Sequence, residues 1–250
     1  MISLKSSREI ELMDRAGSVV ALVHKKMLEV VKPGISTWEL DSIAEKVIRE
    51  NGCTPSFKNL YGFPCATCIS INDILVHGIP DKKTFLKDGD IVSIDVGACY
   101  KGYHGDSAWS YAVGNVDQKA LDLLRVTEEA LYKGLEQVKP GNRVGDIANA
   151  IQTYVEAHGY SCPIEYTGHG IGKQVHEDPY VPNVGKPHSL ELLKKGMCLA
   201  VEPMVFMGKP HCYTLKDGWG VKSRDHSLAA HYEHTVVITD DGYRILTKED

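Results

Sequence analysis

The tetrapeptide VKPG at residues 31–34 returns as VKPG at residues 138–141, 107 positions further along the chain. Each copy follows a segment whose apolar residues recur at helical spacing, and each precedes a second segment of this kind. These second segments close on Gly52 and Gly159, again 107 positions apart, and glycine commonly terminates a helix. Ser36 and Glu39, at capping-box spacing, mark the start of the first of them. The repeat therefore predicts two equivalent units, each beginning with two helices.

The same offset relates two strand-like segments, DGDIVSIDVG at residues 88–97 and KGMCLAVEPM at residues 195–204. Asp95 in the first segment and Glu202 in the second occupy equivalent positions. We expect one catalytic α+β domain over residues 1–250, built from pseudo-repeats at about residues 10–113 and 117–245. A pseudo-two-fold axis would then bring the two carboxylates together.

Asp95 lies inside an apolar strand, where aspartate is intrinsically disfavoured, on the face opposite Val92, Ile94 and Val96. A second strand carries Asp106 after a short turn around residues 100 and 101. A hairpin centred between those two residues would pair Asp95 directly with Asp106, with Cβ atoms about 5 Å apart. Like charges so placed are destabilising unless one is protonated or a cation lies between them. The alternative is that one aspartate only caps the turn.

Two further acidic residues interrupt apolar strands: Glu202 in CLAVEPM and Glu233 in HYEHTVVI. Two divalent cations would balance the four carboxylates, and His169 would add an imidazole. This set is too rich in oxygen for a closed structural zinc site and favours a catalytic pair of Mn, Fe, Co or Zn ions. Such pairs share a bridging water or hydroxide that attacks a carbonyl or phosphoryl centre.

His169 belongs to TGHGIGKQVHEDP, residues 167–179, which combines three glycines with two histidines. The spacing G-x-G-x-G matches neither the dinucleotide-binding nor the P-loop pattern, so phosphate binding is disfavoured. Taken alone, the motif leaves open a metal site and a flexible connection with surface histidines.

Composition excludes several classes of partner. The net charge of −5 provides no positive field to attract nucleic acid or anionic lipid. The charged N-terminal segment contains no signal peptide or membrane span. Seven scattered cysteines are typical of a reducing cytosol, and the Cys65-x-x-Cys68 pattern has no second pair that would complete a zinc ribbon.

Six segments together resemble the type I methionine aminopeptidases: HGIPD (77–81), SIDVGA (93–98), YHGDSAW (103–109), GHGIGKQVHEDP (168–179), LAVEPM (199–204) and YEHTVVIT (232–239). The resemblance implies the pita-bread fold, in which two pseudo-symmetric α+β halves form a central antiparallel sheet backed by helices. We expect type I rather than type II, because no zinc-finger extension precedes the first helix and no large helical insertion interrupts the second half.

The resemblance also implies a set of metal ligands. Asp95 would chelate one ion, and Asp106 and Glu233 would bridge two ions. His169 and Glu202 would complete the other ion's shell. The remaining eight histidines outside the catalytic set are expected not to be ligands; the closest exceptions, His231 and His234, flank Glu233.

By the same resemblance, Glu202 would accept a proton from the attacking water. His77 and His176 would contact the scissile peptide and stabilise the tetrahedral intermediate. The methionine pocket would be lined by Phe63, Cys68, His77, Val175 and Trp219, which suits a polarizable thioether. For Phe63 and Trp219, ordinary core packing is the alternative, and Val175 replaces an aromatic residue that many relatives carry.

The implied activity is removal of the initiator methionine from nascent chains, with preference for a small second residue. The resemblance implies a cytoplasmic monomer with two divalent ions (Co, Mn, Fe or Zn), transient proximity to the ribosome, and no nucleic-acid or membrane partner. One alternative is a proline-specific pita-bread peptidase of the aminopeptidase P or prolidase type, which usually has an additional N-terminal domain. Another is a non-catalytic pita-bread binding protein, but such relatives lose metal ligands.

Overall fold

The computed structural model describes residues 2–248 and consists of two halves in sequence order. The first half contains α1 (Ser7–Val30), α2 (Thr37–Glu50), β1 (Thr54–Pro55), the short 3-10 helix η1 (Leu60–Gly62), β2 (Thr67–Ile71), β3 (Ile74–Val76), β4 (Ile91–Tyr100) and β5 (Tyr103–Ala112). The second half contains α3 (Gln118–Leu135), α4 (Val144–Ala157), β6 (Thr167–Gly170), β7 (Glu177–Pro182), β8 (Cys198–Val201), β9 (Met204–Phe206), β10 (Cys212–Thr214), β11 (Val221–Ser223), β12 (Ala229–His231), β13 (His234–Ile238) and β14 (Tyr243–Ile245).

Local sequence signals set the ends of the helices. The predicted capping box at the start of α2 is confirmed: the Ser36 hydroxyl accepts from the Glu39 amide at 3.2 Å, and the Glu39 carboxylate accepts from the Ser36 amide at 2.9 Å. The predicted glycine ends are confirmed too, because Gly52 (φ 76°) and Gly159 (φ 79°) adopt the left-handed conformation just after α2 and α4. Both VKPG glycines have positive φ as well, so the repeated tetrapeptide is a repeated turn.

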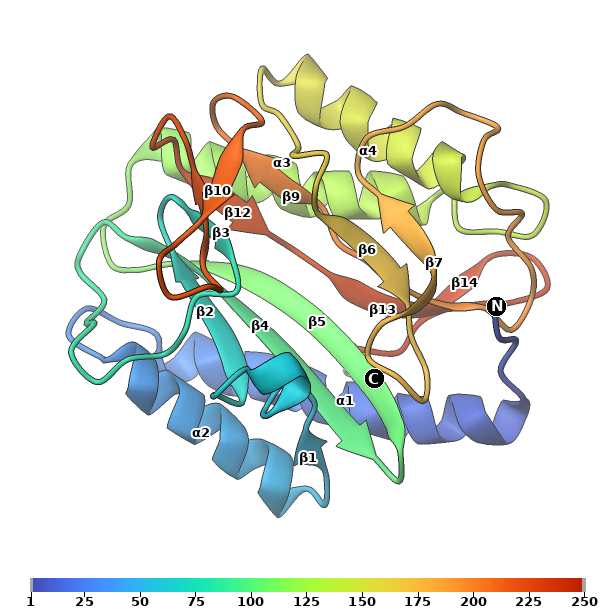
Figure 1. Cartoon of the computed structure of the whole chain (residues 1–250), viewed down its shortest axis with the longest axis horizontal. Helices are drawn as coiled ribbons and strands as arrows, with labels where there is room; N and C mark the ends of the chain where they lie inside the picture. The colour runs from blue at the N-terminus through green and yellow to red at the C-terminus, as the bar shows by residue number, and fades with distance from the viewer. Residues whose placement is uncertain (1, 249–250) are drawn as a thin grey trace.

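The strands form antiparallel sheets that meet in the middle of the molecule (Figure 1). Two small sheets have the orders β10-β11-β3 and β12-β9. Of the two larger sheets, one pairs β4 with β1, β2 and β5, and the other has the order β14-β13-β8-β6-β7. They meet where the Glu233 amide donates to the Ala108 carbonyl at 2.8 Å and the Asp106 amide donates to the Thr235 hydroxyl at 3.0 Å. The predicted α+β architecture is confirmed.

The predicted register of the β4–β5 hairpin is wrong. Asp95 lies opposite Ala108, and Asp106 lies opposite Gly97. The turn is formed by Lys101 (φ 49°) and Gly102 (φ 82°), one position beyond the expected centre, because both residues adopt positive φ and form a two-residue hairpin turn. A one-position shift of the turn changes each pairing by two residues, so both aspartates stay on one face as diagonal neighbours.

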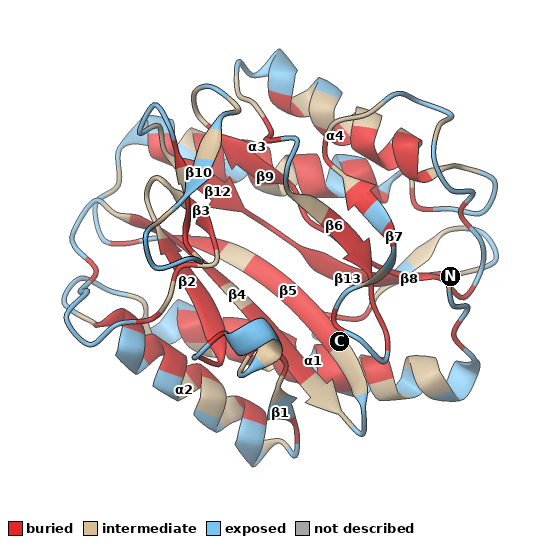
Figure 2. Ribbon diagram, viewed as in Figure 1, coloured by how far each residue is buried: buried red, intermediate tan, exposed pale blue. Residues whose placement is uncertain are grey.

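The hydrophobic core lies between each helix pair and its sheet. Val92, Ile94 and Val96 of β4 pack beneath α1 and α2, as the predicted strand face requires. In the second half, side chains of β8 such as Leu199 pack with those of α3 and α4. Figure 2 shows the buried side of each helix turned toward the strands. Both sheets therefore keep their helix-free faces for the carboxylates. Among residues 2–248, no helix is long and apolar enough to cross a bilayer.

Candidate metal centre

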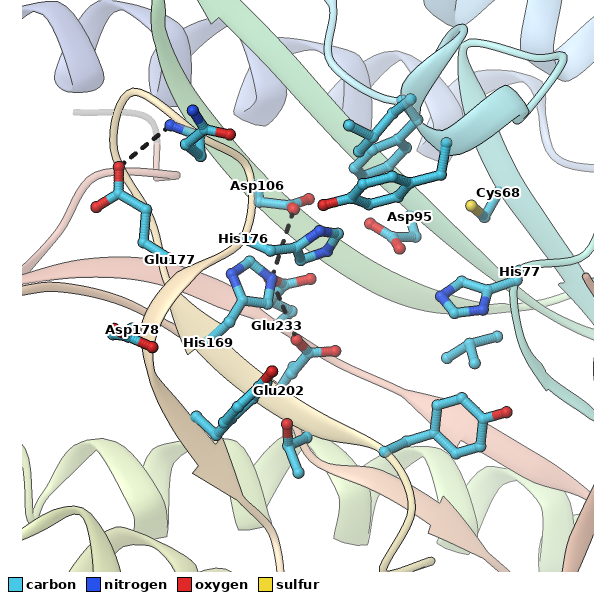
Figure 3. Close-up of a pocket in the computed structure, with 18 of the residues that line it drawn as sticks. Cys68, His77, Asp95, Asp106, His169, His176, Glu177, Asp178, Glu202 and Glu233 are labelled. Atoms are coloured by element: carbon cyan, nitrogen blue, oxygen red, sulfur yellow. Dashed lines mark hydrogen bonds and ion pairs between the residues drawn. The ribbon is translucent and has the colours of Figure 1, made fainter. Parts of the chain in front are cut away.

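Four carboxylates from four separate strand positions converge on one cavity of about 970 Å³ (Figure 3). Asp95 lies within β4 and Asp106 within β5, whereas Glu202 directly follows β8 and Glu233 directly precedes β13. His169 reaches the same cavity from β6. The five residues proposed as ligands from the sequence are thus brought together by the meeting of the two sheets.

The ligand atoms of these side chains lie close together but mostly beyond hydrogen-bond distance of one another. His169 Nε2 lies 3.5 Å from Glu202 Oε1 and 4.0 Å from Asp106 Oδ2. Ligand atoms of Asp106, His169 and Glu233 all lie within 4.8 Å of one another. Such a triplet has the spacing and the mixture of imidazole and carboxylate donors that divalent transition metals bind.

The electrostatics of the cluster also favour a cation. Within the described residues, Asp95 Oδ1, Asp106 Oδ1 and Glu233 Oε1 are buried and accept no hydrogen bond. Burial raises the pKa of Asp95 to about 7. Burial, together with the charge of neighbouring carboxylates, also holds the pKa of Asp106 and of Glu233 well above its ordinary range. A divalent ion would satisfy these oxygens and reverse the repulsion, so the residues present fit a metal centre.

His169 has the tautomer that a ligand needs. Its Nδ1–H donates to the Gly170 carbonyl at 2.9 Å, which leaves the Nε2 lone pair facing Glu202 and Asp106. Burial lowers the pKa of His169 to about 3, so the imidazole is neutral at pH 7. His169 therefore presents a neutral nitrogen with a free lone pair, suited to bind a metal beside the carboxylates.

Two more histidines line the cavity next to this cluster. The ring of His176 lies 4.5 Å from the ring of His169, and Figure 3 shows its side chain directed toward the carboxylates. His77 follows β3 with φ of 60°, a costly conformation for a residue other than glycine that is often retained at functional sites. Burial lowers the pKa of His77 to about 4 and also lowers that of His176. Both are therefore neutral side chains that can donate a hydrogen bond.

An apolar pocket adjoins the carboxylates. Phe63 and Trp219 are in edge-to-face contact at 5.0 Å between ring centroids, and both line the cavity together with Cys68. Burial holds the pKa of the Cys68 thiol well above its ordinary value, so it is neutral. Val175 packs against Phe63 and Cys68 but does not line the cavity. The structure therefore places Val175 behind the pocket wall, and Phe63 and Trp219 both pack together and face the cavity.

His231 belongs to this site, although the sequence predicted that it is not a ligand and ranked it only among the closest exceptions. Its Nε2 lies 3.1 Å from Glu202 Oε2 and 3.9 Å from Glu233 Oε2. The signal was present, because residues two apart in a strand share a face, and His231 is two residues before Glu233. His234, by contrast, turns away and contacts the Thr247 hydroxyl at 2.9 Å. Lys5 and other N-terminal residues also line the cavity, which no local pattern indicated.

Comparisons with known proteins agree with this geometry. The model of metallopeptidase family M24 matches residues 11–240. The chain is 52% identical to methionine aminopeptidase 1 of Bacillus subtilis strain 168, over 99% of this chain and 100% of that protein. A solved methionine aminopeptidase from Thermotoga maritima matches with a TM-score of 0.98 and 43% identity over 100% of both chains. The prolidase from Pyrococcus furiosus has a TM-score of 0.80 and 25% identity, over 99% of this chain and 66% of that one. The predicted pita-bread fold is confirmed.

Proposed function

Because the chain belongs to metallopeptidase family M24 and, within it, to the type I methionine aminopeptidases, we propose that the carboxylate cluster is its catalytic centre. The protein is a metal-dependent hydrolase that removes the initiator methionine from proteins and peptides. The observation that carries the site assignment is the convergence of four carboxylates and His169 beside an apolar pocket.

The proposal assigns a role to each ligand. Asp95 would hold one divalent ion, Asp106 and Glu233 would bridge two, and His169 and Glu202 would hold the second. Two ions balance the four carboxylate charges, and Co, Mn, Fe and Zn all suit this donor set. When bound, such ions activate water and polarise the scissile carbonyl.

Glu202 is the proposed general base. Its carboxylate lies between two imidazoles, with Oε1 3.5 Å from His169 Nε2 and Oε2 3.1 Å from His231 Nε2. Burial raises its pKa in the metal-free protein well above the ordinary value. Its place beside the proposed ions would let this carboxylate accept a proton from the attacking water. The same carboxyl group would then return the proton to the leaving amine.

His77 and His176 are the proposed donors to the developing oxyanion. Both line the cavity beside the carboxylates, and both are neutral at pH 7 because burial lowers the pKa of each imidazole. A neutral imidazole can donate an N–H bond without adding charge to the site. Donors already in position are effective because they need no reorganisation during the reaction.

The apolar wall of Phe63, Cys68 and Trp219 would receive the methionine side chain. Because this wall adjoins the acidic cluster, the substrate's α-amino group would lie near the metals, so the site would accept a chain terminus. We further propose a small second residue, a nascent-chain substrate met near the ribosome, a cytoplasmic location and a monomeric enzyme. These points rest on the family's activity and not on any contact within the molecule.

The experiment is turnover of Met-Gly-Met-Met and of a peptide with proline in second position, after chelation and after readdition of Mn, Fe, Co or Zn. We expect no turnover after chelation and recovery with metal on the first peptide. Full activity without metal, or cleavage restricted to the X-Pro peptide, would overturn the proposal. The prolidase-like alternative shares the fold, but the chain is far more similar to methionine aminopeptidases.

A further inference from the structure

Residues near the N-terminus hold the loop that carries His176 in place. Lys5 Nζ donates to Glu177 Oε2 at 2.7 Å, and the Ser3 hydroxyl donates to the same oxygen at 3.2 Å. The backbone of this N-terminal arm, residues 2–5, is itself held where the Lys5 amide donates to the Gly196 carbonyl at 2.8 Å. The arm therefore joins the start of α1, the turn before β8 and the residue that follows His176.

The ion pair is shielded from water. Only 4% of the Lys5 side chain and 15% of the Glu177 side chain are exposed. Burial by itself would raise the pKa of Glu177, but the hydrogen bonds from Lys5 and from the Gln174 amide outweigh it and hold that pKa below its ordinary value. Removing one partner would leave a charge buried without its counter-ion, which is costly.

Gly172 makes room for this contact. A Cβ atom on Gly172 would lie 2.5 Å from Lys5 Cε and 2.8 Å from Glu177 Oε1. The Lys5 side chain thus crosses the loop where glycine provides the space. The second oxygen of Glu177 accepts from the Gln174 amide at 3.1 Å, which closes the loop on the residues before His176.

His176 depends on the loop for its orientation. Within residues 2–248, its imidazole makes no hydrogen bond to the protein, and its ring contacts are with His169 and Tyr61, at 4.5 and 6.0 Å between centroids. In Figure 3, the side chain of His176 points toward the carboxylates and that of the adjacent Glu177 points away from them. The position of this ring is therefore set by its backbone. That backbone is held by the side-chain contacts of Glu177, together with the pairing of Glu177 with Gly170 and the hydrogen bond from the His104 amide to the Gly172 carbonyl.

We propose that Lys5 and Glu177 are positioning residues whose ion pair holds His176 over the reacting peptide. The N-terminal arm would then contribute to catalysis by positioning His176. This inference rests on the proposed role of His176 as an oxyanion donor. It predicts a loss of turnover without a loss of metal, because neither Lys5 nor Glu177 contacts the proposed ligands.

The first test compares Lys5→Met, which keeps the chain across Gly172, with Glu177→Gln, which keeps an acceptor for the Gln174 amide. We expect kcat on Met-Gly-Met-Met to fall by roughly 10²-fold, as displaced catalytic groups do, with KM and Mn²⁺ affinity within about twofold of wild type. Lys5→Arg should recover most of the activity. Arg244→Met, which breaks the exposed 2.6 Å pair with Asp14 on α1, is the matched control and should behave as wild type.

A double-mutant cycle separates positioning from general stability. In a His176→Ala background, Lys5→Met should cause no further loss of kcat, because the group it positions is absent. Additive losses, an unchanged kcat in both single variants, or a kcat loss that parallels loss of Mn²⁺ affinity would overturn the proposal. If a single variant is poorly folded, Lys5→Met/Glu177→Gln removes both charges together and should show the same fall in kcat.

Imidazole NMR of the metal-free protein tests the contact without any catalysis. We expect the His176 ring signals to shift or broaden in Lys5→Met and those of His24 to stay unchanged. Unchanged His176 signals would overturn the inference. If wild type fails to cleave Met-Gly-Met-Met while the His176 signals still respond to Lys5→Met, the proposed function fails and the positioning contact stands.

Discussion

Each half of the molecule contributes two carboxylates to the cavity, but the strands that carry them are connected differently in the two halves. In the first half, Asp95 and Asp106 lie on strands joined by the two-residue turn at Lys101 and Gly102. In the second half, Glu202 and Glu233 lie one residue beyond the last pair of β8 and β13, and β9 to β12 intervene along the chain. The long connection carries Trp219 and His231. The repeated part of the fold thus builds the acidic cluster, and the long connection adds Trp219 to the pocket wall and His231 to the cluster.

A second difference separates the two proposed metal positions. His169 in β6 pairs with Ala200, and the position equivalent to Ala200 in the first half is Ser93, which pairs with Ser70. Ser70 accepts the Gly78 amide at 3.1 Å and presents no imidazole to the cluster. At these two equivalent positions, the second half therefore offers a nitrogen to a metal where the first half offers a hydroxyl, which makes the two proposed ion positions chemically distinct.

The largest expected effect tests whether the halves contribute equally to the cluster. Asp106→Asn and Glu233→Gln should each lower kcat/KM by about 10³-fold or more, corresponding to ~4 kcal/mol of transition-state stabilisation, because each removes a proposed bridging carboxylate. Circular dichroism should remain that of wild type. Retained turnover in either variant would contradict the bridging role, and loss in only one would break the equivalence of the halves.

The next effect tests the distinct ion positions. His169→Ser gives the second half the side chain that the first half has at Ser70. We expect roughly a 10²-fold weaker affinity for one of two ions, measured by calorimetric titration with Mn²⁺, since a donor is lost. Ser70→Ala is the control and should leave both affinities unchanged. Equal weakening of both ions, or of neither, would contradict the asymmetric assignment.

A smaller effect tests the connection between β8 and β13. Trp219→Ala should lower kcat/KM for methionine peptides by about 30-fold, from ~2 kcal/mol of apolar contact, and leave Mn²⁺ affinity unchanged. The measurement is steady-state hydrolysis of Met-Gly-Met-Met beside calorimetry. Weakened metal binding would mean that the connection supports the cluster as well as the pocket.

Features that depend on residues close together in the sequence could be predicted, and features that depend on distant residues could not. The Ser36–Glu39 cap and the left-handed Gly52 depend on adjacent residues, and both were predicted. The hairpin register was not predicted, because it depends on a positive φ at Lys101, and lysine seldom adopts positive φ. The contact between Lys5 and Glu177 joins residues 172 positions apart, and only the folded chain shows it.

The candidate site divides in the same way. Carboxylates inside apolar strands are conspicuous in any sequence, so the acidic residues could be proposed from the repeat. His231 was noted as flanking Glu233 but was expected not to be a ligand, and no local pattern showed its contact with Glu202. The ligand, donor and pocket roles stay predictions until the variants above are measured.

The smallest effect concerns a titratable group that only one half contains. His24 of α1 contacts the Tyr111 hydroxyl at 2.8 Å and the Ser107 carbonyl at 3.0 Å, whereas the equivalent position in α3 is the buried Leu131. Burial lowers the pKa of His24 to about 3, so between pH 6.5 and 3 the unfolded chain binds this proton and the folded one does not. The contribution of this neutral histidine to the free energy of unfolding is complete above pH 6.5. It falls by ~1.4 kcal/mol for each pH unit below that, so the protein is less stable by about 1.4 kcal/mol at pH 5.5. Urea unfolding of wild type and His24→Gln at pH 7.5 and 5.5 should show this difference. An equal pH dependence in both proteins would mean that the histidine titrates alike in the folded and unfolded chain.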